Sequence, residues 1–487
     1  MRLRVACGTV VALIFACSSG SFWAQPEGTP LVELPPDSAR PHPVPKELGA
    51  WVDSYVGAIG KGLGEAYEPS GIVLVAQDGR PIVIRSFGRA NRSTGAVPDV
   101  DTQFRIASNT KQFTAVTIAQ LAEQSRLKYS DPISKFLPHV PHAWASITIH
   151  QLLTQTSGLP SYTAQKEILA HEDKPHTHDQ VIASISALPL NFRPGERFEY
   201  SNTNYYLLGM IIEKISGESY ESYLQKHILA RAGMTRSSTI ESASQHDVAL
   251  GYTMNDDDEP IRAQRVDSSV PFAAGALHST ARDLLAWDHA LAGKALISEV
   301  SKTRLFTPEK DGYACGWVRS EVEHETVLSH GGRMRGCDAD VARVPPRGLL
   351  VVALSNNQFF DAQGLVKVVL RMALGGVAVP PPNGATIVKT DPTLVRSYEG
   401  EYLLTRESEY QLSSKLPKSN IEELQLISLS DKGGYMNVQA NGQSGYRVYQ
   451  AADGSFVSPR RQITLRFAHD GFVITQYDLV MDYTRQH

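Results

Sequence analysis

A serine and a lysine three residues apart, Ser108 and Lys111, form the first pair in this chain whose types and spacing suggest chemistry. A serine hydroxyl is a weak nucleophile at neutral pH and needs a base within hydrogen-bond reach. On a helix, residues three apart share one face, with about 5–6 Å between their Cβ atoms. If a buried helix begins at Ser108, desolvation lowers the pKa of Lys111, and the helix N-terminus favours negative charge on the serine. We therefore predict that Ser108 is a nucleophile activated by Lys111.

A second polar group, Tyr200 and Asn202, follows a loop at residues 192–199 that contains a Pro-Gly turn. A tyrosine beside cations has its usual pKa of about 10 lowered, and it can then serve as a base. The side-chain amide of Asn202 offers both a donor and an acceptor, which suits it to orienting Lys111 and a substrate amide.

The third group is His330, which is followed by Gly331 and Gly332 at the end of a strand-like run, residues 327–329. Two glycines there allow a substrate to lie close to the backbone. The strand backbone can then hold the substrate and donate to a developing oxyanion.

These residues need elements that hold them together. The segment 108–126 is nearly apolar all round, which predicts a buried central helix. Runs at 72–76 and 82–84 flank an Asp-Gly pair and predict a hairpin. Apolar spacing predicts helices at 46–66, 205–215 and 220–232, strands at 327–332 and 349–355, and a closing helix at 361–374.

The character of the chain changes after this region. Residues 377–392 contain three consecutive prolines and are interpreted as a linker. Residues 393–487 show short alternating strands with Gly-containing turns, which predicts a separate β-barrel or β-sandwich domain. The intervening residues 46–376 form the predicted catalytic domain.

The N-terminus is typical of an export signal, with two arginines before an apolar stretch and then small residues. We predict a signal peptide at residues 1–24, a flexible arm at 25–45 and a periplasmic or secreted protein. The sequence around Cys17 also loosely fits a lipoprotein signal, in which that cysteine would carry a lipid anchor. The stretch is shorter than the roughly 20 residues of a membrane span, and no other long apolar run predicts a transmembrane segment.

The net charge, the histidines and the cysteines indicate which classes of partner and ligand to expect. A formal net charge of −4 provides no basic excess for nucleic acid, so we expect a small-molecule or peptide substrate. The histidines at 171–178 are interpreted as part of a polar loop rather than a metal site, and the chemistry above requires no cofactor. Cys315 and Cys337 either form a disulfide in an oxidising compartment or lie separately in the core. The oligomeric state stays open.

Together, the three groups resemble the motifs of the penicillin-recognising serine hydrolases, which include class C β-lactamases, D-Ala-D-Ala carboxypeptidases, D-aminopeptidases and related esterases. That pattern is S-x-x-K, then Y-x-N, then K-T-G or H-x-G, in this order. Four further segments resemble family motifs: residues 152–160, 192–202, 275–283 and 313–317. The likeness covers residues 47–375. It departs from the family at Gln155, where a histidine is common, and at Ala232, where a proline is common.

The resemblance implies an α+β, β-lactamase/transpeptidase-like fold with an antiparallel sheet flanked by helices and an all-helical subdomain. It also implies that Ser108 forms an acyl-enzyme and that Lys111 and Tyr200 share proton transfer, with either one as the base. The oxyanion donors would be the backbone N–H groups of Ser108 and Arg333, and Gly332 would border the substrate.

His330, in place of the lysine of K-T-G, would polarise Tyr200 or help to protonate the leaving group, and it makes strong β-lactamase activity less expected. The predicted function is an exported serine hydrolase of D-amino-acid peptides, peptidoglycan stem peptides or small esters. The alternative is a penicillin-binding or sensor protein of the same fold that does not turn over.

Overall fold

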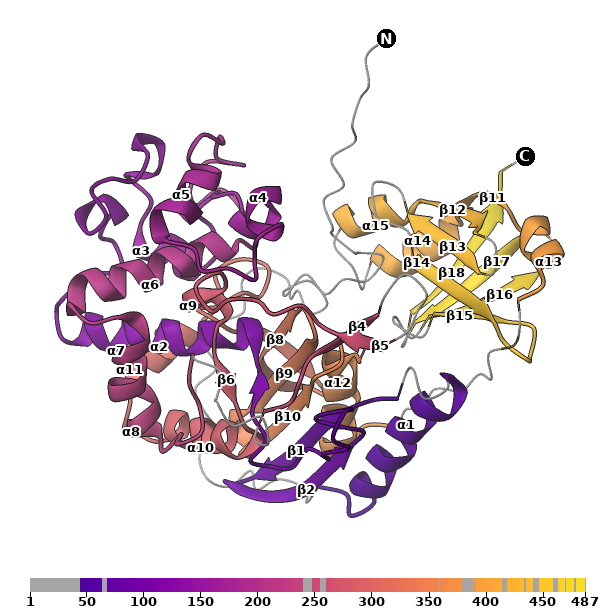
Figure 1. The fold of residues 1–487 in the computed structure, drawn as a ribbon, viewed down its shortest axis with the longest axis horizontal. Coiled ribbons are helices and arrows are strands. Elements are labelled where there is room, and N and C mark those ends of the chain that lie inside the picture. Colours follow the sequence, from indigo (N-terminus) through magenta and orange to yellow (C-terminus); the bar gives the residue numbers. More distant parts are fainter. Residues whose placement is uncertain are drawn as a thin grey trace, which may run out of the picture. The chain divides into compact units, whose positions relative to one another are not determined.

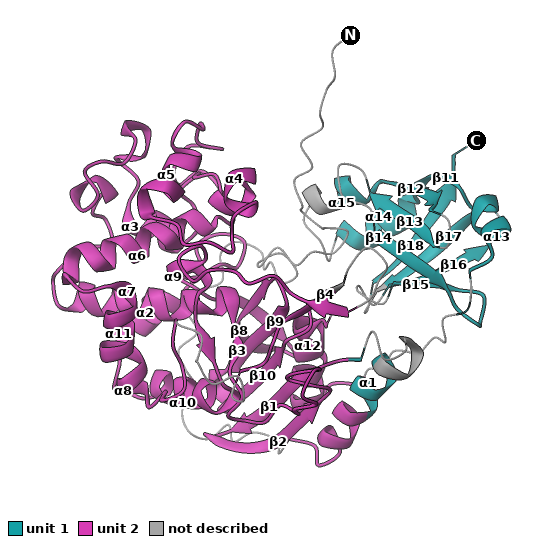
Figure 2. Ribbon diagram, viewed as in Figure 1, with its two compact units in different colours: residues 1–24, 54–68, 380–487 teal, residues 25–53, 69–379 magenta. Residues whose placement is uncertain are grey.

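The structure is a computed structural model that describes residues 44–486 apart from short internal gaps. The gaps are 64–67, 240–247, 255–259, 359, 379–387, 389, 414–417, 433–434, 441–445, 459–462, 469 and 477–478. The predicted signal peptide with Cys17, nearly all of the predicted arm, and residues 379–387 and 389 of the predicted linker lie outside the described residues. The chain divides into two compact units. The first consists mainly of Pro69–Val379 and is magenta (unit 2 in the key of Figure 2), and the second consists mainly of Pro380–His487 and is teal (unit 1 in that key). The boundary runs through the first helix, so that part of this helix falls in each unit.

The first unit contains an antiparallel sheet whose strand order, among described residues, is β2-β1-β10-β9-β8-β7. Its strands are β1 (Gly71–Gln77), β2 (Arg80–Phe87), β7 (Val318–Val322), β8 (Glu325–Met334), β9 (Cys337–Val344) and β10 (Leu349–Ser355). The predicted hairpin joins β1 to β2. Its turn residues Asp78 and Gly79 both have positive φ, 49° and 73°, as a two-residue turn of this kind requires. The central strands β9 and β10 are buried along their whole length.

Helices lie beside this sheet and also form a region of their own (Figure 1). Helices α10 (Ala281–Ala292) and α12 (Ala362–Ala373) pack on the strands. The helical region contains α2 (Thr110–Glu123), α3 (Ile149–Leu153), α4 (Lys166–Leu169), α5 (His178–Ser186), α6 (Asn202–Ser216), α7 (Tyr220–Leu224), α8 (Ala230–Ala232), α9 (Phe272–Gly275) and α11 (Glu299–Phe306). The small ladders are β3 (Phe104–Arg105) with β6 (His278–Ser279), and β4 (Tyr252–Met254) with β5 (Pro260–Arg262).

The predicted central helix is α2, and it is buried on every side from Thr110 to Leu121. Its neighbours are α6, α9 and α11, so it has no solvent face that would need charged residues. The serine that was expected to open it lies one turn earlier, in the 3₁₀ turn η2 (Ala107–Asn109). This antiparallel sheet with flanking and separate helices confirms the predicted α+β architecture.

The second unit is a closed barrel of eight strands, which resolves the choice between barrel and sandwich. The strands are β11 (Gly400–Leu404), β12 (Leu426–Asp431), β13 (Met436–Ala440), β14 (Tyr446–Gln450), β15 (Phe456–Ser458), β16 (Ile463–Ala468), β17 (Gly471–Gln476) and β18 (Leu479–Arg485). Pairing of β11 with β18 closes the barrel and removes the exposed edges.

The sequence reasoning missed three helices in this unit, α13 (Pro392–Ser397), α14 (Arg406–Ser413) and α15 (Lys418–Leu424). In addition, α1 (Leu48–Leu63) agrees with the helix expected near the N-terminus. Within the residues that the structure describes, no helix is both long and apolar enough to span a bilayer.

Candidate active site

Ser108 sits at a sharp change of backbone direction between β3 and α2. Ala107, just before it, has φ of +45°, a left-handed conformation that is costly for a residue with a Cβ. Two side chains fix this turn: Asn109 Nδ2 donates to Ile106 O at 3.0 Å, and Thr110 Oγ1 donates to Ala107 O at 2.7 Å. Ala107 and Asn109 are buried while Ser108 is half-exposed. The strained turn thus leaves the serine hydroxyl accessible in a segment that is otherwise buried.

Lys111 is fully buried, and its amine contacts three oxygens. Nζ lies 2.9 Å from Ser108 Oγ, 2.8 Å from Asn202 Oδ1 and 2.8 Å from the carbonyl oxygen of Ala274. Burial holds the pKa of Lys111 well below its usual value. In its neutral form, which burial favours, this amine has two N–H groups, and the two carbonyl oxygens can only accept. The lone pair of the amine then faces Ser108, the one partner that can donate a proton.

Tyr200 and Asn202 reach the site from the start of α6. The hydroxyl of Tyr200 donates to Ser108 Oγ at 3.0 Å, so the serine oxygen lies between Tyr200 and Lys111. Asn202 Nδ2 donates to Thr163 Oγ1 at 3.1 Å, which leaves Oδ1 turned toward Lys111. The structure therefore brings together the predicted serine, lysine, tyrosine and asparagine in one hydrogen-bonded group.

Side chains that the sequence analysis had not assigned hold this group in place. Gln155 Oε1 accepts from the backbone N–H of Ser201, and Ser161 Oγ accepts from that of Asn202 at 3.3 Å. Gln155 itself has φ of +60°. The only sequence signal for these residues was their position in the family-like segment 152–160 and just after it. Their role is to fix the start of α6 and with it the direction of Tyr200.

His330 lies on β8, fully buried, with its ring 6.1 Å from that of Tyr200 between centroids. Its Nδ1 contacts Gly331 O at 2.6 Å, so Nδ1 carries the proton, and Nε2 accepts from the hydroxyl of Tyr313 at 3.4 Å. Burial, and next the positive charge that Lys111 carries when protonated, lower the pKa of His330 to about 3. A neutral ring has no positive charge with which to polarise Tyr200, so in this geometry His330 contacts the tyrosine by packing.

Tyr313 is a site residue that the sequence analysis quoted only as part of a family-like segment. It is buried against Tyr200 and His330, and burial raises the pKa of its hydroxyl well above 10. It therefore stays protonated and can act as the donor to His330. Nothing in its local sequence indicates this, because the contacts join residues on different elements.

The strand β8 passes close to the nucleophile at Gly332. A Cβ at this position would lie 2.1 Å from Ile106 O and 3.0 Å from the backbone nitrogen of Ser108, so only glycine fits. Arg333, whose N–H was predicted to complete the oxyanion hole, directly follows. Its side chain points elsewhere and pairs with Asp338, while Arg335 pairs with Glu172. Both guanidinium groups thus have carboxylate partners within the chain.

The disulfide considered for Cys315 and Cys337 is not formed, because both thiols are free and buried. Cys315 lies in the loop before β7, where its backbone N–H bonds to Leu305 O, and Cys337 lies at the start of β9, paired with Met334. They belong to different elements with different neighbours. The alternative, that each is a separate core residue, holds.

The histidines at 171–178 do not gather around a metal site, and no cluster of metal-binding side chains occurs among the described residues. The interpretation of the whole segment as a solvated loop was incomplete. His178 begins α5, with Nδ1 3.0 Å from the hydroxyl of Tyr206 and Nε2 2.9 Å from Glu213 Oε2. This histidine joins α5 to α6 and has a structural partner on each ring nitrogen.

Comparison with known proteins places this geometry in context. The family model described as Beta-lactamase matches residues 57–371. Protein flp of Staphylococcus aureus (strain N315) is 29% identical over 308 residues, which are 60% of this chain and 61% of that protein. The chain therefore spans about three fifths of the length of this curated relative.

Two solved structures are also similar. A penicillin-binding protein from Bacillus halodurans shares 28% identity, with a TM-score of 0.54 over 62% of this chain and 95% of that one. The octameric penicillin-binding protein homologue from Pyrococcus abyssi shares 21% identity, with a TM-score of 0.60 over 90% of this chain and 99% of that one, and supports the fold.

Proposed function

The chain belongs to the beta-lactamase family, and on that premise we propose that it is a serine hydrolase that cleaves amides or esters through an acyl-enzyme at Ser108. The observation that carries this proposal is the hydrogen bonding of Lys111. Two carbonyl oxygens, of Asn202 and Ala274, occupy the N–H groups of a neutral amine and leave its lone pair to Ser108. A buried amine in this arrangement is a base aimed at one hydroxyl.

The reaction begins when Lys111 takes the proton of Ser108 as Oγ attacks the substrate carbonyl. The oxyanion is held by the backbone N–H groups of Ser108 and Arg333. Tyr200 then gives its proton to the leaving amine or alcohol, and Lys111 returns its proton to the tyrosine. Water attacks the acyl-enzyme by the reverse route, and the serine regains its proton. Every proton thus moves between groups that contact Ser108 Oγ.

We propose D-amino-acid peptides, peptidoglycan stem peptides or small esters as substrates, and an exported location. The similarity to a penicillin-binding protein supports labelling of Ser108 by a penicillin. Weak turnover of β-lactams is expected, because His330 is neutral and replaces the cationic lysine of the K-T-G pattern.

The test uses the purified protein without residues 1–24, a fluorescent penicillin and a fluorophosphonate. Ser108→Ala should abolish labelling by both probes. Ser201→Ala is the matched control, because Ser201 is the neighbour of Tyr200 in sequence, is buried, and has no hydrogen-bond partner for its hydroxyl among the described residues. Labelling that persists in Ser108→Ala would exclude this serine as the nucleophile.

A substrate panel then separates an enzyme from a protein that only binds. The panel contains nitrocefin, D-Ala-D-Ala peptides, D-amino-acid amides and p-nitrophenyl esters, and intact-mass spectra follow the adduct on Ser108. Release of the acyl group from at least one class supports turnover. A permanent adduct with every class would instead assign the chain as a penicillin-binding or sensor protein.

The exported location is tested by isolating the protein from cell fractions and determining its N-terminus by mass spectrometry. A periplasmic or secreted protein that begins after residue 24 is expected. A lipid-modified N-terminal Cys17 would indicate a membrane-anchored form, and an intact N-terminus in the cytosol would contradict export.

A further inference from the structure

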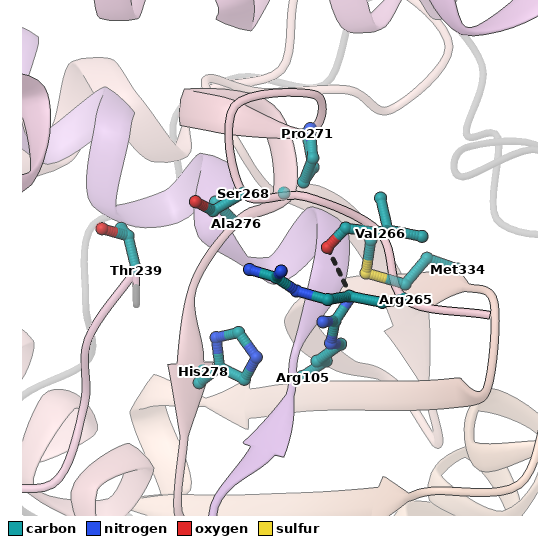
Figure 3. A pocket seen from close by; sticks show the side chains of 10 residues that line it. Arg105, Thr239, Arg265, Val266, Ser268, Pro271, Ala276, His278 and Met334 are labelled. Carbon is teal, nitrogen blue, oxygen red and sulfur yellow. Dashed lines mark hydrogen bonds between the residues drawn. The ribbon is translucent and has the colours of Figure 1, made fainter. Parts of the chain in front are cut away.

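A cavity of about 80 Å³ is lined by residues of β3, β6, β8 and α9 and of the neighbouring loops, and it takes no part in the reaction described above (Figure 3). Such a volume can hold one small anionic group or several waters, since one water needs roughly 10–15 Å³ by this measure. Its polar lining comes from Arg105, Arg265, His278, Ser268 and Thr239.

The position of the cavity follows from the ladder between β3 and β6. Arg105 and His278 are directly opposite each other in this ladder, which places their Cβ atoms about 4.5–5.5 Å apart. Arg105 is three residues before Ser108, so the two lie at most about 10 Å apart along the chain. On the other side, the lining residue Gly275 follows Ala274, whose carbonyl oxygen binds Lys111. Residues of the cavity lining are therefore close along the chain both to Ser108 and to the carbonyl group that binds Lys111.

His278 is the most informative residue of the lining. Its side chain is buried, with 4% exposed, and neither ring nitrogen makes a hydrogen bond of good geometry among the described residues, although the backbone carbonyl groups of Ala276 and Ser238 lie near the ring. Burial, and next the charge of Arg105, lower the pKa of His278 to about 3, and they outweigh the weak hydrogen bonding to the carbonyl groups of Ala276 and Ser238, which raises it. The ring is therefore neutral and has one N–H donor to offer. Buried donors without partners are rare, and each one needs an explanation.

The charges around the cavity select the ligand class. Arg105 and Arg265 bring two positive charges, and Asp267 lies 3.7 Å from Arg265 and supplies one negative charge. Glu172 also interacts with Arg105 but is paired with Arg335, so that pair adds no net charge. The local sum is one positive charge, which suits a monoanion better than a dianion. Arg105 is held in place by donating to Val266 O at 3.2 Å, and Arg265 has a side chain that is 67% exposed and can move toward a ligand. Planar guanidinium groups match the geometry of a carboxylate.

We propose that the cavity bounded by Arg105, Arg265 and His278 binds a carboxylate carried by the substrate. The inference rests on the proposed hydrolysis at Ser108 and narrows it to substrates with a free carboxylate. The N–H of His278 and the guanidinium of Arg265 donate to the carboxylate oxygens. Substrates in which a carboxamide replaces the carboxylate lose these charge-assisted bonds and are hydrolysed more slowly.

The test compares kcat/KM for matched pairs of substrates. The first series contains p-nitrophenyl monoesters of glutaric, adipic and suberic acid and their ω-carboxamides, so that the carboxylate is on the acyl side at increasing reach. The second contains acetylated peptides ending in D-Ala-D-Ala and their C-terminal amides. The variants are His278→Phe and Arg265→Gln, with Arg371→Gln as the control, because Arg371 is an ion-paired arginine of similar type on α12.

The wild type should prefer the carboxylate in at least one series by roughly 10- to 100-fold, the usual weight of one or two charge-assisted hydrogen bonds. Both cavity variants should lose this preference and keep the rate on the carboxamide within about twofold, while Arg371→Gln should behave as the wild type. Equal rates on both members of every pair, or an equal loss on both in the variants, would overturn the proposal.

A second measurement does not depend on turnover. Acetate is titrated into Ser108→Ala while the imidazole ¹⁵N signal of His278 is followed, the signal being assigned by its loss in His278→Phe. A saturable shift that Arg265→Gln weakens supports the carboxylate site even if no substrate is hydrolysed and the proposed function fails. Absence of any acetate-dependent shift would overturn the carboxylate site even if the hydrolase activity is found.

Discussion

Replacing Lys111 by arginine tests whether this residue acts as a base or only as a positive charge. Arginine places a permanent cation next to Ser108 and Asn202, and because it stays protonated it cannot accept the proton of a serine. If Lys111 is the base, the acylation rate should fall by about 10²–10⁴, the usual contribution of general-base catalysis. That loss corresponds to about 3–5 kcal/mol of transition-state stabilisation at 1.36 kcal/mol per decade.

Removing the amine of Lys111 should cost less free energy of unfolding than it costs in transition-state stabilisation. Lys111→Met removes the amine and leaves the oxygens of Asn202 and Ala274 without this donor, at a cost of about 1–3 kcal/mol for each unpaired buried group. The variant no longer has to bury an amine, and this offsets part of the cost. We expect a net loss of about 2 kcal/mol or less, so that the folded population at 25 °C is almost unchanged.

The assay is the rate of fluorophosphonate or penicillin labelling of Ser108, followed by intact mass at several pH values, together with a melting curve for each variant. Lys111→Ala, in the presence of methylamine, provides the matched rescue experiment, because a small free amine can occupy the vacated space and act as the base. The rate should rise with methylamine concentration and with pH. An arginine variant that keeps more than about a tenth of the wild-type rate would refute the assignment of Lys111 as the base.

Four further outcomes are expected. Because burial lowers the pKa of Lys111, the wild-type kcat/KM should fall as the pH drops through that lowered pKa. His330, whose pKa is about 3, should add no further change of rate near neutral pH. Measuring kcat/KM against pH in the wild type and in His330→Asn checks this, and a fall in rate at acid pH that only the His330 variant lacks would contradict it. Ala107→Gly should stabilise the fold by about 1 kcal/mol by relieving the positive φ, as measured by urea unfolding, and a loss of stability would show that the turn is unstrained. Reducing agent should leave the melting temperature unchanged, since Cys315 and Cys337 are free, and a drop would indicate a bond between them. His278→Phe should leave stability unchanged or raise it by about 1–3 kcal/mol, because it removes buried nitrogens that make no hydrogen bond of good geometry, and a clear destabilisation would mean that the ring already bonds within the protein.

The sequence alone determined the features that depend on local geometry. Ser108 and Lys111 are three residues apart at the start of an apolar segment, and any helix there brings their side chains together. The Asp78-Gly79 pair fixed the hairpin because both residues adopt positive φ. The alternation of the C-terminal strands indicated a β domain. It could not show that the first strand, β11, pairs with the last, β18, because that pairing joins the two ends of the domain.

Only the tertiary structure decided which distant atoms complete the site. The carbonyl oxygen of Ala274 is 163 residues from Lys111, and no spacing rule relates the two. The contact between Tyr313 and His330, and the opposition of Arg105 and His278, likewise arise from how separate elements pack. The pKa of a buried group follows from those neighbours and from lost solvent, so its direction is a property of the folded chain. Local spacing can indicate a nucleophile and a base, but the hydrogen-bond acceptors that orient the base are brought to it by the packing of the whole domain.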